Sequence, residues 1–144
     1  MADITISTPA NIRALTEQGA IVLAGVAGSA TDVGNLVVMS SDDAWDDADG
    51  NVAEGTVAKA QGVCVASYDG ETVIAAGNPM SICVFGPVAG IGGLTAGSNY
   101  YLSDTVGAIA DAVGTYDRIV GWGVYVSSEV CLFVHPQQND PSSA

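Results

Sequence analysis

The sequence predicts an all-β domain, a compact β-sandwich or small β-barrel of about nine or ten short strands, with an extended N-terminal arm. The composition is 49% hydrophobic and only 13% charged, with 18 glycines, which is typical of a compact, turn-rich protein. Short segments rich in Val, Ile and Tyr recur at spacings of roughly 8 to 12 residues between Gly, Asp and Ser turns. No amphipathic helical segment separates them, so a parallel α/β fold is disfavoured.

The chain of 144 residues fits one domain. We divide it into an arm over residues 1–18, a β domain over 19–136 and a polar tail over 137–144. Asp3–Ser7 alternates polar and apolar residues and predicts an extended edge strand. After it the sequence allows two interpretations: a helix that ends at Gly19, or a second extended segment with a turn over Thr8–Asn11.

Nine further strands follow from apolar runs bounded by turn residues. They are expected at Gly19–Gly25, Asn35–Ser40, Gly62–Ser67, Glu71–Ala75, Met80–Val88, Asn99–Ser103, Ala108–Ala110, Arg118–Val126 and Glu129–His135. Tyr68-Asp69-Gly70 predicts a hairpin turn, Gly86-Pro87 the end of a strand, and Ser127-Ser128 the turn of the last hairpin. That hairpin has the longest apolar content, so we expect it at the centre of the core.

The segments between these strands are predicted to be turns and loops. They comprise a small-residue turn over Val26–Asp32, an acidic loop over Ser41–Gly50, a polar link over Ala53–Gln61 and a glycine-rich loop over Gly90–Gly97. Alternate strand positions share one face of a sheet. This rule predicts a core of Ile21, Leu23, Val37, Val63, Val65, Ile82, Val84, Tyr101, Ile119, Val124, Leu132 and Val134.

The charge balance excludes two classes of partner. Three cationic residues, Arg13, Lys59 and Arg118, stand against 16 acidic ones, for a net charge of −13. Nucleic-acid phosphates and anionic membranes both require clustered Lys and Arg, so we expect neither as a partner. No apolar run approaches the roughly 20 residues of a membrane helix. The first residues lack the basic start of a signal peptide, and we expect synthesis in a cytoplasm.

The three cysteines each lie inside an apolar strand, at Cys64, Cys83 and Cys131. Their odd number and wide spacing match no metal-ligand or redox motif. We therefore expect buried, reduced thiols that act as small hydrophobic side chains.

The segment Asp42–Asp49 is the best candidate for a metal site, because clustered carboxylates can bind calcium. An EF-hand alignment on Gly50 fails, since it places Trp45 first and Thr56 twelfth. The competing interpretation is a solvated hairpin loop whose tryptophan packs back on the sheet.

The remaining candidates for chemistry are weak. The glycine-rich loop precedes a strand and not the helix N-terminus that phosphate-binding loops use. His135 is the single histidine and ends an apolar strand, where a role at a sheet edge is more common than catalysis. The sequence therefore predicts a protein without enzymatic activity, cofactor or metal.

Two stretches resemble a known family. The opening ADITISTPAN is similar to the ADITIT-AANV opening of certain tailed-phage structural proteins. Residues 93–111, GLTAGSNYYLSDTVGAIAD, and 116–136, YDRIVGWGVYVSSEVCLFVHP, resemble a turn-and-strand pattern of phage head decoration, or cement, proteins. The middle, LVVMSSDDAWDDADGN and QGVCVASYDG, fits the same layout. The chain departs from this pattern in its all-Asp acidic loop, where the family often has lysines, and in its terminal extension over 137–144.

The resemblance implies a protein on the outer surface of a phage capsid that bridges capsid subunits. It implies the major capsid protein as partner and a homotrimer as the assembled form. The alternative is a tail-fibre or baseplate module involved in host attachment. Because the arm alternates like an edge strand, we predict that Asp3, Ile4, Thr5, Ile6 and Ser7 contact the capsid or a sister protomer.

Overall fold

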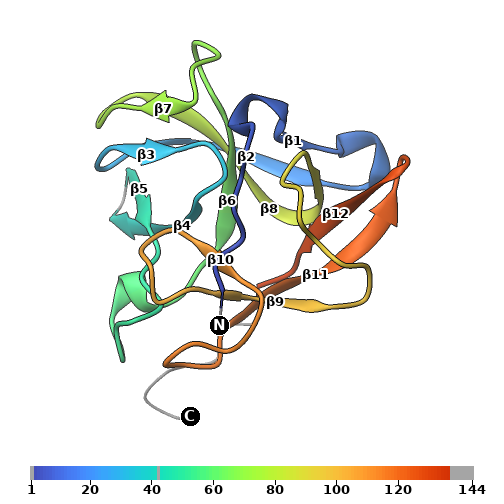
Figure 1. Ribbon diagram of the computed structural model, residues 1–144. Coiled ribbons are helices and arrows are strands. Elements are labelled where there is room, and N and C mark those ends of the chain that lie inside the picture. Colours follow the sequence, from blue (N-terminus) through green and yellow to red (C-terminus); the bar gives the residue numbers. More distant parts are fainter. Residues whose placement is uncertain (1, 42, 137–144) are drawn as a thin grey trace.

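The computed structural model describes residues 2–41 and 43–136, and the predicted tail over 137–144 lies outside them (Figure 1). Within this part the chain forms twelve β-strands and three 3-10 turns, so the all-β prediction is confirmed. The strands are β1 (Arg13–Ala14), β2 (Ile21–Val26), β3 (Thr31–Asp32), β4 (Leu36–Ser41), β5 (Ala44–Asp47), β6 (Gly62–Ser67), β7 (Val73–Ile74), β8 (Pro79–Ala89), β9 (Asn99–Leu102), β10 (Ile109–Ala110), β11 (Ile119–Val126) and β12 (Glu129–Val134). The 3-10 turns are η1 (Pro9–Asn11), η2 (Thr16–Gln18) and η3 (Thr56–Ala58).

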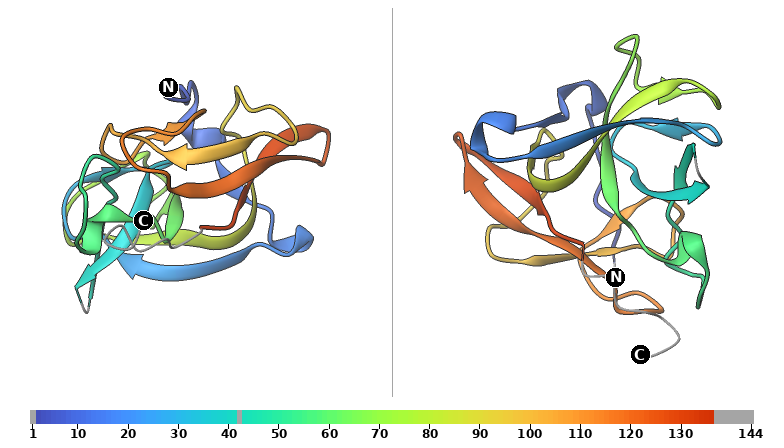
Figure 2. Two further views of the ribbon diagram at one scale, coloured as in Figure 1. Left: turned by 90° about the horizontal axis from the view of Figure 1, so that it is seen from below. Right: turned by 180° about the vertical axis from the view of Figure 1, so that it is seen from behind.

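Ten of these strands form one antiparallel sheet that bends back on itself without closing into a barrel (Figure 2). Its main path runs β10-β9-β11-β12-β8-β6-β4-β5, and β1 and β2 also pair with β8. A single bridge between Ala27 and Trp45 brings β5 beside the end of β2. The strands β3 and β7 pair separately as a small second sheet.

The eleven-residue strand β8 joins the two parts of the large sheet. Its first part pairs with β2 and β6, and its second part pairs with β1 and β12. Gly86-Pro87, the predicted strand end, lies inside it and marks the change of partners. Gly86 has φ +102°, and a side chain there would meet the Cα of Ala20 at 2.6 Å. The prediction of an end is wrong because the glycine bends the strand without interrupting its pairing.

One further prediction is wrong, and two others have a mixed outcome. The Gly62–Ser67 and Glu71–Ala75 segments form no hairpin, because β7 pairs with β3, while β6 pairs with β4 and β8. The N-terminal helix is absent from the described residues, where η1, β1 and η2 occupy its place in agreement with the extended alternative. The last hairpin lies inside the sheet between β9 and β8 and buries Leu132 and Val134. Its other face is not part of the core, since Trp122 is 38% exposed.

The predicted loops also contain regular structure. The acidic segment holds β5, so it is one arm of a hairpin with β4 and not an open loop. The turn over Val26–Asp32 ends in β3. The polar link over Ala53–Gln61 holds the single turn η3, as its sequence allowed.

About half of the predicted core is correct. Six of its members are buried: Val37, Val63, Val65, Ile82, Leu132 and Val134. Another four are half-buried: Val84, Tyr101, Ile119 and Val124. Ile21 and Leu23 are instead 52% and 45% exposed. On β2 the half-buried Val22 packs against the core, so the alternation was assigned one residue out of register.

Arg118 is a charged member of the interior, with 4% of its surface exposed. Its guanidinium donates hydrogen bonds to the carbonyl oxygens of Gly50 (3.3 Å) and Ala53 (3.1 Å) and lies 4.5 Å from the Tyr116 ring centre. Burial lowers the pKa of Arg118, and nearby Tyr116, Asp49 and Asp104 oppose that shift. Arg118 therefore holds the loop after β5 against the start of β11.

Candidate functional site

The predicted contact arm lies along its own domain as an added edge beside β10 (Figure 1). The Ile4 N–H donates to the Ile109 carbonyl (2.8 Å), and the Asp111 N–H donates to the Ala2 carbonyl (3.0 Å). Ser103 donates a short hydrogen bond to the Asp3 carboxylate. The arm is therefore paired within the protomer.

The side chains of the arm alternate between the domain and solvent. Ile4 and Ile6 are half-buried and pack against the core, whereas Thr5 and Ser7 are exposed. Thr5 and Ser7 line a surface pocket of about 410 Å³ whose other wall is the glycine-rich segment 90–93. An arm contact with a capsid or a sister protomer stays a prediction, and it would have to use the exposed side chains.

The acidic hairpin is organised by hydrogen bonds from neutral side chains. Asp46 accepts from the hydroxyl of Ser29 (2.7 Å) and from that of Ser40. Asp47 accepts from the Thr31 hydroxyl and from the Asn35 amide (3.1 Å). Each of these two carboxylates thus has donors from neighbouring segments, which accounts for their place in a half-buried strand.

The side chain of Asp47 in this hairpin has a raised pKa. Burial raises its pKa, the hydrogen bonds from Thr31 and Asn35 oppose that shift, and the nearby charges of Asp32 and Asp46 add to it. Among residues 2–41 and 43–136, no three acidic, histidine or cysteine side chains converge as metal ligands. Asp42, part of the calcium hypothesis, is outside these residues. Trp45 is buried, as the alternative interpretation of the segment expected.

The glycine-rich segment packs against the N-terminal region. Gly90 has φ +87° and lies against the backbone of Asn11, too close for any side chain at that position. Its N–H donates to the Glu129 carboxylate (3.3 Å), which also accepts from Arg13 at 2.8 Å. These contacts give the segment a structural role in joining the arm region to β12.

The cysteines are three buried free thiols, in agreement with the sequence. Burial raises the pKa of Cys64 to about 12 and raises those of Cys83 and Cys131. A thiol with a raised pKa holds little thiolate at neutral pH and is a poor nucleophile.

The most distinctive surface is a chain of four aromatic rings, which we call the aromatic strip: Phe85 on β8, Trp122 on β11, Phe133 on β12 and His135 directly after β12. Trp122 stacks on Phe133 with 5.0 Å between ring centres. The edge of Phe133 then meets Phe85 at 5.1 Å, and Phe85 meets His135 at 5.7 Å. Phe85 is 39% and Trp122 38% exposed. Both rings contact Phe133, and both also face solvent.

The backbone fixes the strip in place. Trp122 pairs in register with Phe133 across β11 and β12, and β12 pairs with β8, which carries Phe85. On β2, Ile21 pairs in register with Phe85 and extends the apolar surface. Because all these strands belong to one sheet, the rings are presented on a rigid base.

The sequence interpretation missed the strip because it placed the whole last hairpin in the core. One signal was available: Trp122 lies between Gly121 and Gly123. Both glycines are buried, and a side chain at either one would meet a backbone carbonyl, of Phe133 and Thr95 respectively. A large ring between two glycines that must face closely packed backbone is expected on the opposite, outer side.

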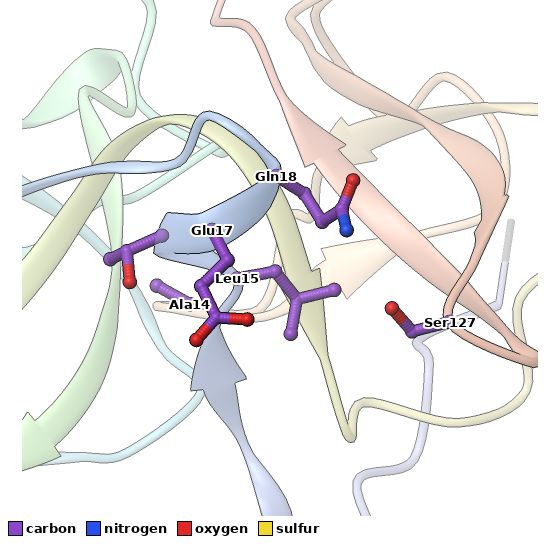
Figure 3. Close-up of a pocket in the computed structure, with 6 residues that line it drawn as sticks. Ala14, Leu15, Glu17, Gln18 and Ser127 are labelled. Carbon is purple, nitrogen blue, oxygen red and sulfur yellow. The ribbon is translucent and has the colours of Figure 1, made fainter.

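A second surface hollow of about 250 Å³ lies between η2 and the turn of the last hairpin (Figure 3). Leu15 and Ser127 stand on opposite sides of it, and Glu17 and Gln18 supply its polar groups. It is small and shallow, and it marks the place where the N-terminal segment meets the β11–β12 turn.

Comparison with protein-family models, with curated proteins and with solved structures finds no match for this chain. Among the described residues, no helix has the length and apolar character needed to span a bilayer. The functional interpretation therefore depends on the resemblance noted in the sequence and on the surfaces described above.

Proposed function

We propose that this chain is a non-enzymatic virion structural protein, a decoration or cement protein that binds the outer surface of a phage head. The observation that carries the proposal is the aromatic strip on a rigid sheet. Exposed, contiguous aromatic surface on a folded domain marks a site of protein–protein contact. The turn-and-strand resemblance to phage decoration proteins supports the same function, with the major capsid protein as partner.

The physical role follows from mass action. A protein that binds neighbouring subunits of the assembled shell, and not the free subunits, stabilises the shell by its binding free energy. Such a protein needs a stable body and a binding surface, and it needs no reactive groups. Its net charge of −13 favours solubility and disfavours adhesion to packaged nucleic acid.

The test is quantitative mass spectrometry of purified particles, with the chain measured against the major capsid protein. A decoration protein is expected at a copy number comparable with that of the capsid subunit. Particles stripped of the chain should break at lower temperature and recover when the purified chain is added back. A few copies per particle would instead identify the alternative tail-fibre or baseplate module, and complete absence would contradict both.

The arm is tested separately, because Ile4 and Ile6 belong to the packed body and their deletion would confuse folding with binding. We therefore choose the exposed positions and substitute Thr5→Arg and Ser7→Arg together. If the arm contacts the capsid or a sister protomer, occupancy on stripped particles falls while the thermal midpoint is retained. Full occupancy by this variant would remove the arm from the contact surface.

The proposed homotrimer is tested by analytical ultracentrifugation of the purified chain and by its arrangement on the particle. A trimer in either state supports the proposal. A monomer in solution and singly spaced copies on the shell would contradict it.

A further inference from the structure

We infer that the aromatic strip binds a cationic protein surface, one that places Arg or Lys side chains over its exposed rings. This inference deepens the proposed function, on which it rests, by assigning the contact surface and the chemistry of the partner. Three observations carry it. They are the geometry of the rings, the net charge of the whole chain, and the fact that the arginines of the chain are already bound to groups within it.

The ring geometry suits an approaching cation. Phe85 and Trp122 are each more than a third exposed, while Phe133 lies between them in contact with both. Aromatic faces attract guanidinium and ammonium groups, and tryptophan does so most strongly. The edge-to-face contact of Phe85 with Phe133, at 83°, turns two neighbouring rings in different directions and offers both a face and an edge.

Two of the three cations of the chain, Arg118 and Arg13, already have partners within it, and the third, Lys59, is half-buried after η3. Arg118 is buried beneath the loop at Gly50 and Ala53. Arg13 is bound to Glu129 at 2.8 Å. With 16 acidic residues against three basic ones, the outer field is strongly negative and attracts a positively charged partner.

The same charge argues against a second copy of the chain on the strip. Two copies that met through the strip would bring −13 against −13, and like charges brought together there oppose association. The proposed homotrimer would therefore use other surfaces of the chain. A partner with an apolar centre and a rim of Arg and Lys satisfies both the rings and the surrounding field.

The first experiment tests the chemistry without any particle. The probes are two synthetic octapeptides, an alternating Arg–Leu peptide and its Glu–Leu counterpart, and the readout is the indole N–H signal of each tryptophan by NMR. We expect the Arg–Leu peptide to shift the Trp122 signal, to leave that of the buried Trp45 unchanged and to bind more weakly as salt is added. The Glu–Leu peptide should leave both signals in place.

Matched variants separate the strip from general attraction to an acidic protein. The double variant Phe85→Ser and Trp122→Ser removes two rings of the strip. The control Tyr125→Ser removes a ring that is 67% exposed, three residues from Trp122 and therefore on the opposite face of β11. Neither variant changes the net charge. We expect the double variant to weaken Arg–Leu binding by about tenfold or more. The control should stay within about twofold of the wild type.

The inference is overturned if the double variant binds the Arg–Leu peptide as the wild type does, because the attraction would then be non-specific. Equal binding of the Glu–Leu peptide also overturns it. So does a wild-type oligomer that the double variant dissociates in the ultracentrifuge, since the occupant would then be a second copy. Circular dichroism of the double variant confirms that it is folded before either comparison is made.

The second experiment uses particles stripped of the chain. We expect lower occupancy for the double variant than for the wild type and the Tyr125→Ser control. If the wild type itself fails to bind these particles, the proposed function fails, whatever the peptides show. If wild type and double variant bind equally, only the assignment of the strip fails.

Discussion

The hairpins β4–β5 and β11–β12 each carry one of the two tryptophans, which is buried in the first hairpin and exposed in the second. Trp45 on β5 is 4% exposed beneath the end of β2, where Gly25 leaves room for its ring. Trp122 on β11 is 38% exposed and stacks on its strand neighbour Phe133. The same residue type thus completes the core in one hairpin and forms surface in the other. What decides between them is whether another strand covers the hairpin.

The largest effect is expected from Trp45→Ala. Removal of a buried indole leaves a cavity and should lower the free energy of unfolding by about 3–5 kcal/mol. Urea denaturation followed by circular dichroism measures the change. A loss below about 1 kcal/mol would mean that Trp45 is no more important to the fold than a surface ring, and the contrast between the hairpins would disappear.

Gly25→Ala tests the same packing from the other side. An added methyl would lie 2.7 Å from two atoms of the Trp45 indole and 2.8 Å from the Ile82 side chain. Overpacking of this kind costs about 1–3 kcal/mol. The neighbouring, exposed Ala24→Ser should stay within about 0.5 kcal/mol in the same denaturation series. If Gly25→Ala lowers the free energy of unfolding by no more than the Ala24→Ser control does, β2 does not pack closely on Trp45.

Trp122→Ser should cost only about 1 kcal/mol, close to the value of one aromatic contact. The side chain covers its partner Phe133 and leaves no enclosed cavity when it is removed. The same denaturation measurement applies. A loss as large as that of Trp45→Ala would show that the strip serves the stability of the sheet, and the case for a binding surface would weaken.

The smallest effect concerns the pH dependence of the β4–β5 hairpin. Burial raises the pKa of Asp47, so its ionised form is disfavoured in the fold. The stability that this group contributes is therefore fully present below its unfolded pKa and is lost as pH rises through the higher folded pKa.

Asp47→Asn should remove this contribution. The difference in free energy of unfolding between wild type and variant, measured by denaturation from pH 7 down to pH 4, should shift in favour of the wild type as pH falls. Asp69 and Asp104 have lowered pKa values because they accept hydrogen bonds, and they act in the opposite direction, but they are present in both proteins and cancel. A constant difference across this range would contradict the raised pKa.

The sequence predicted the class of fold and most strand positions because local apolar runs and turn residues are short-range signals. It did not predict which strands pair with one another. Tyr68-Asp69-Gly70 has the composition of a hairpin turn, yet β7 leaves β6 and pairs with β3. The choice depends on which distant strand has an open edge, and local composition contains no such information.

The strip could not be predicted from its own residues for the same reason. An apolar strand with covered faces and one with an exposed face differ only in what lies above them. For β2 the alternation of Ile21 and Leu23 indicated a buried face, but both side chains are exposed and Val22, on the other face, packs against the core. In the arm the alternation correctly placed Ile4 and Ile6 on one side, because this short extended segment follows the simple rule although, of its described residues, only Asp3 forms a bridge.

The strand β8 also constrains the order in which the molecule can fold. Its final residues pair with β1 near the start of the chain and with β12 near its end, at Ala14 and Leu132 opposite Val88. Closing contacts between such distant segments is entropically costly, and folding that depends on them is slow. On the ribosome, β8 has β2 and β6 available early, but its second part has no strand on the β12 side until the last hairpin emerges. The aromatic strip is therefore assembled last, and an incomplete chain presents an open sheet edge in its place.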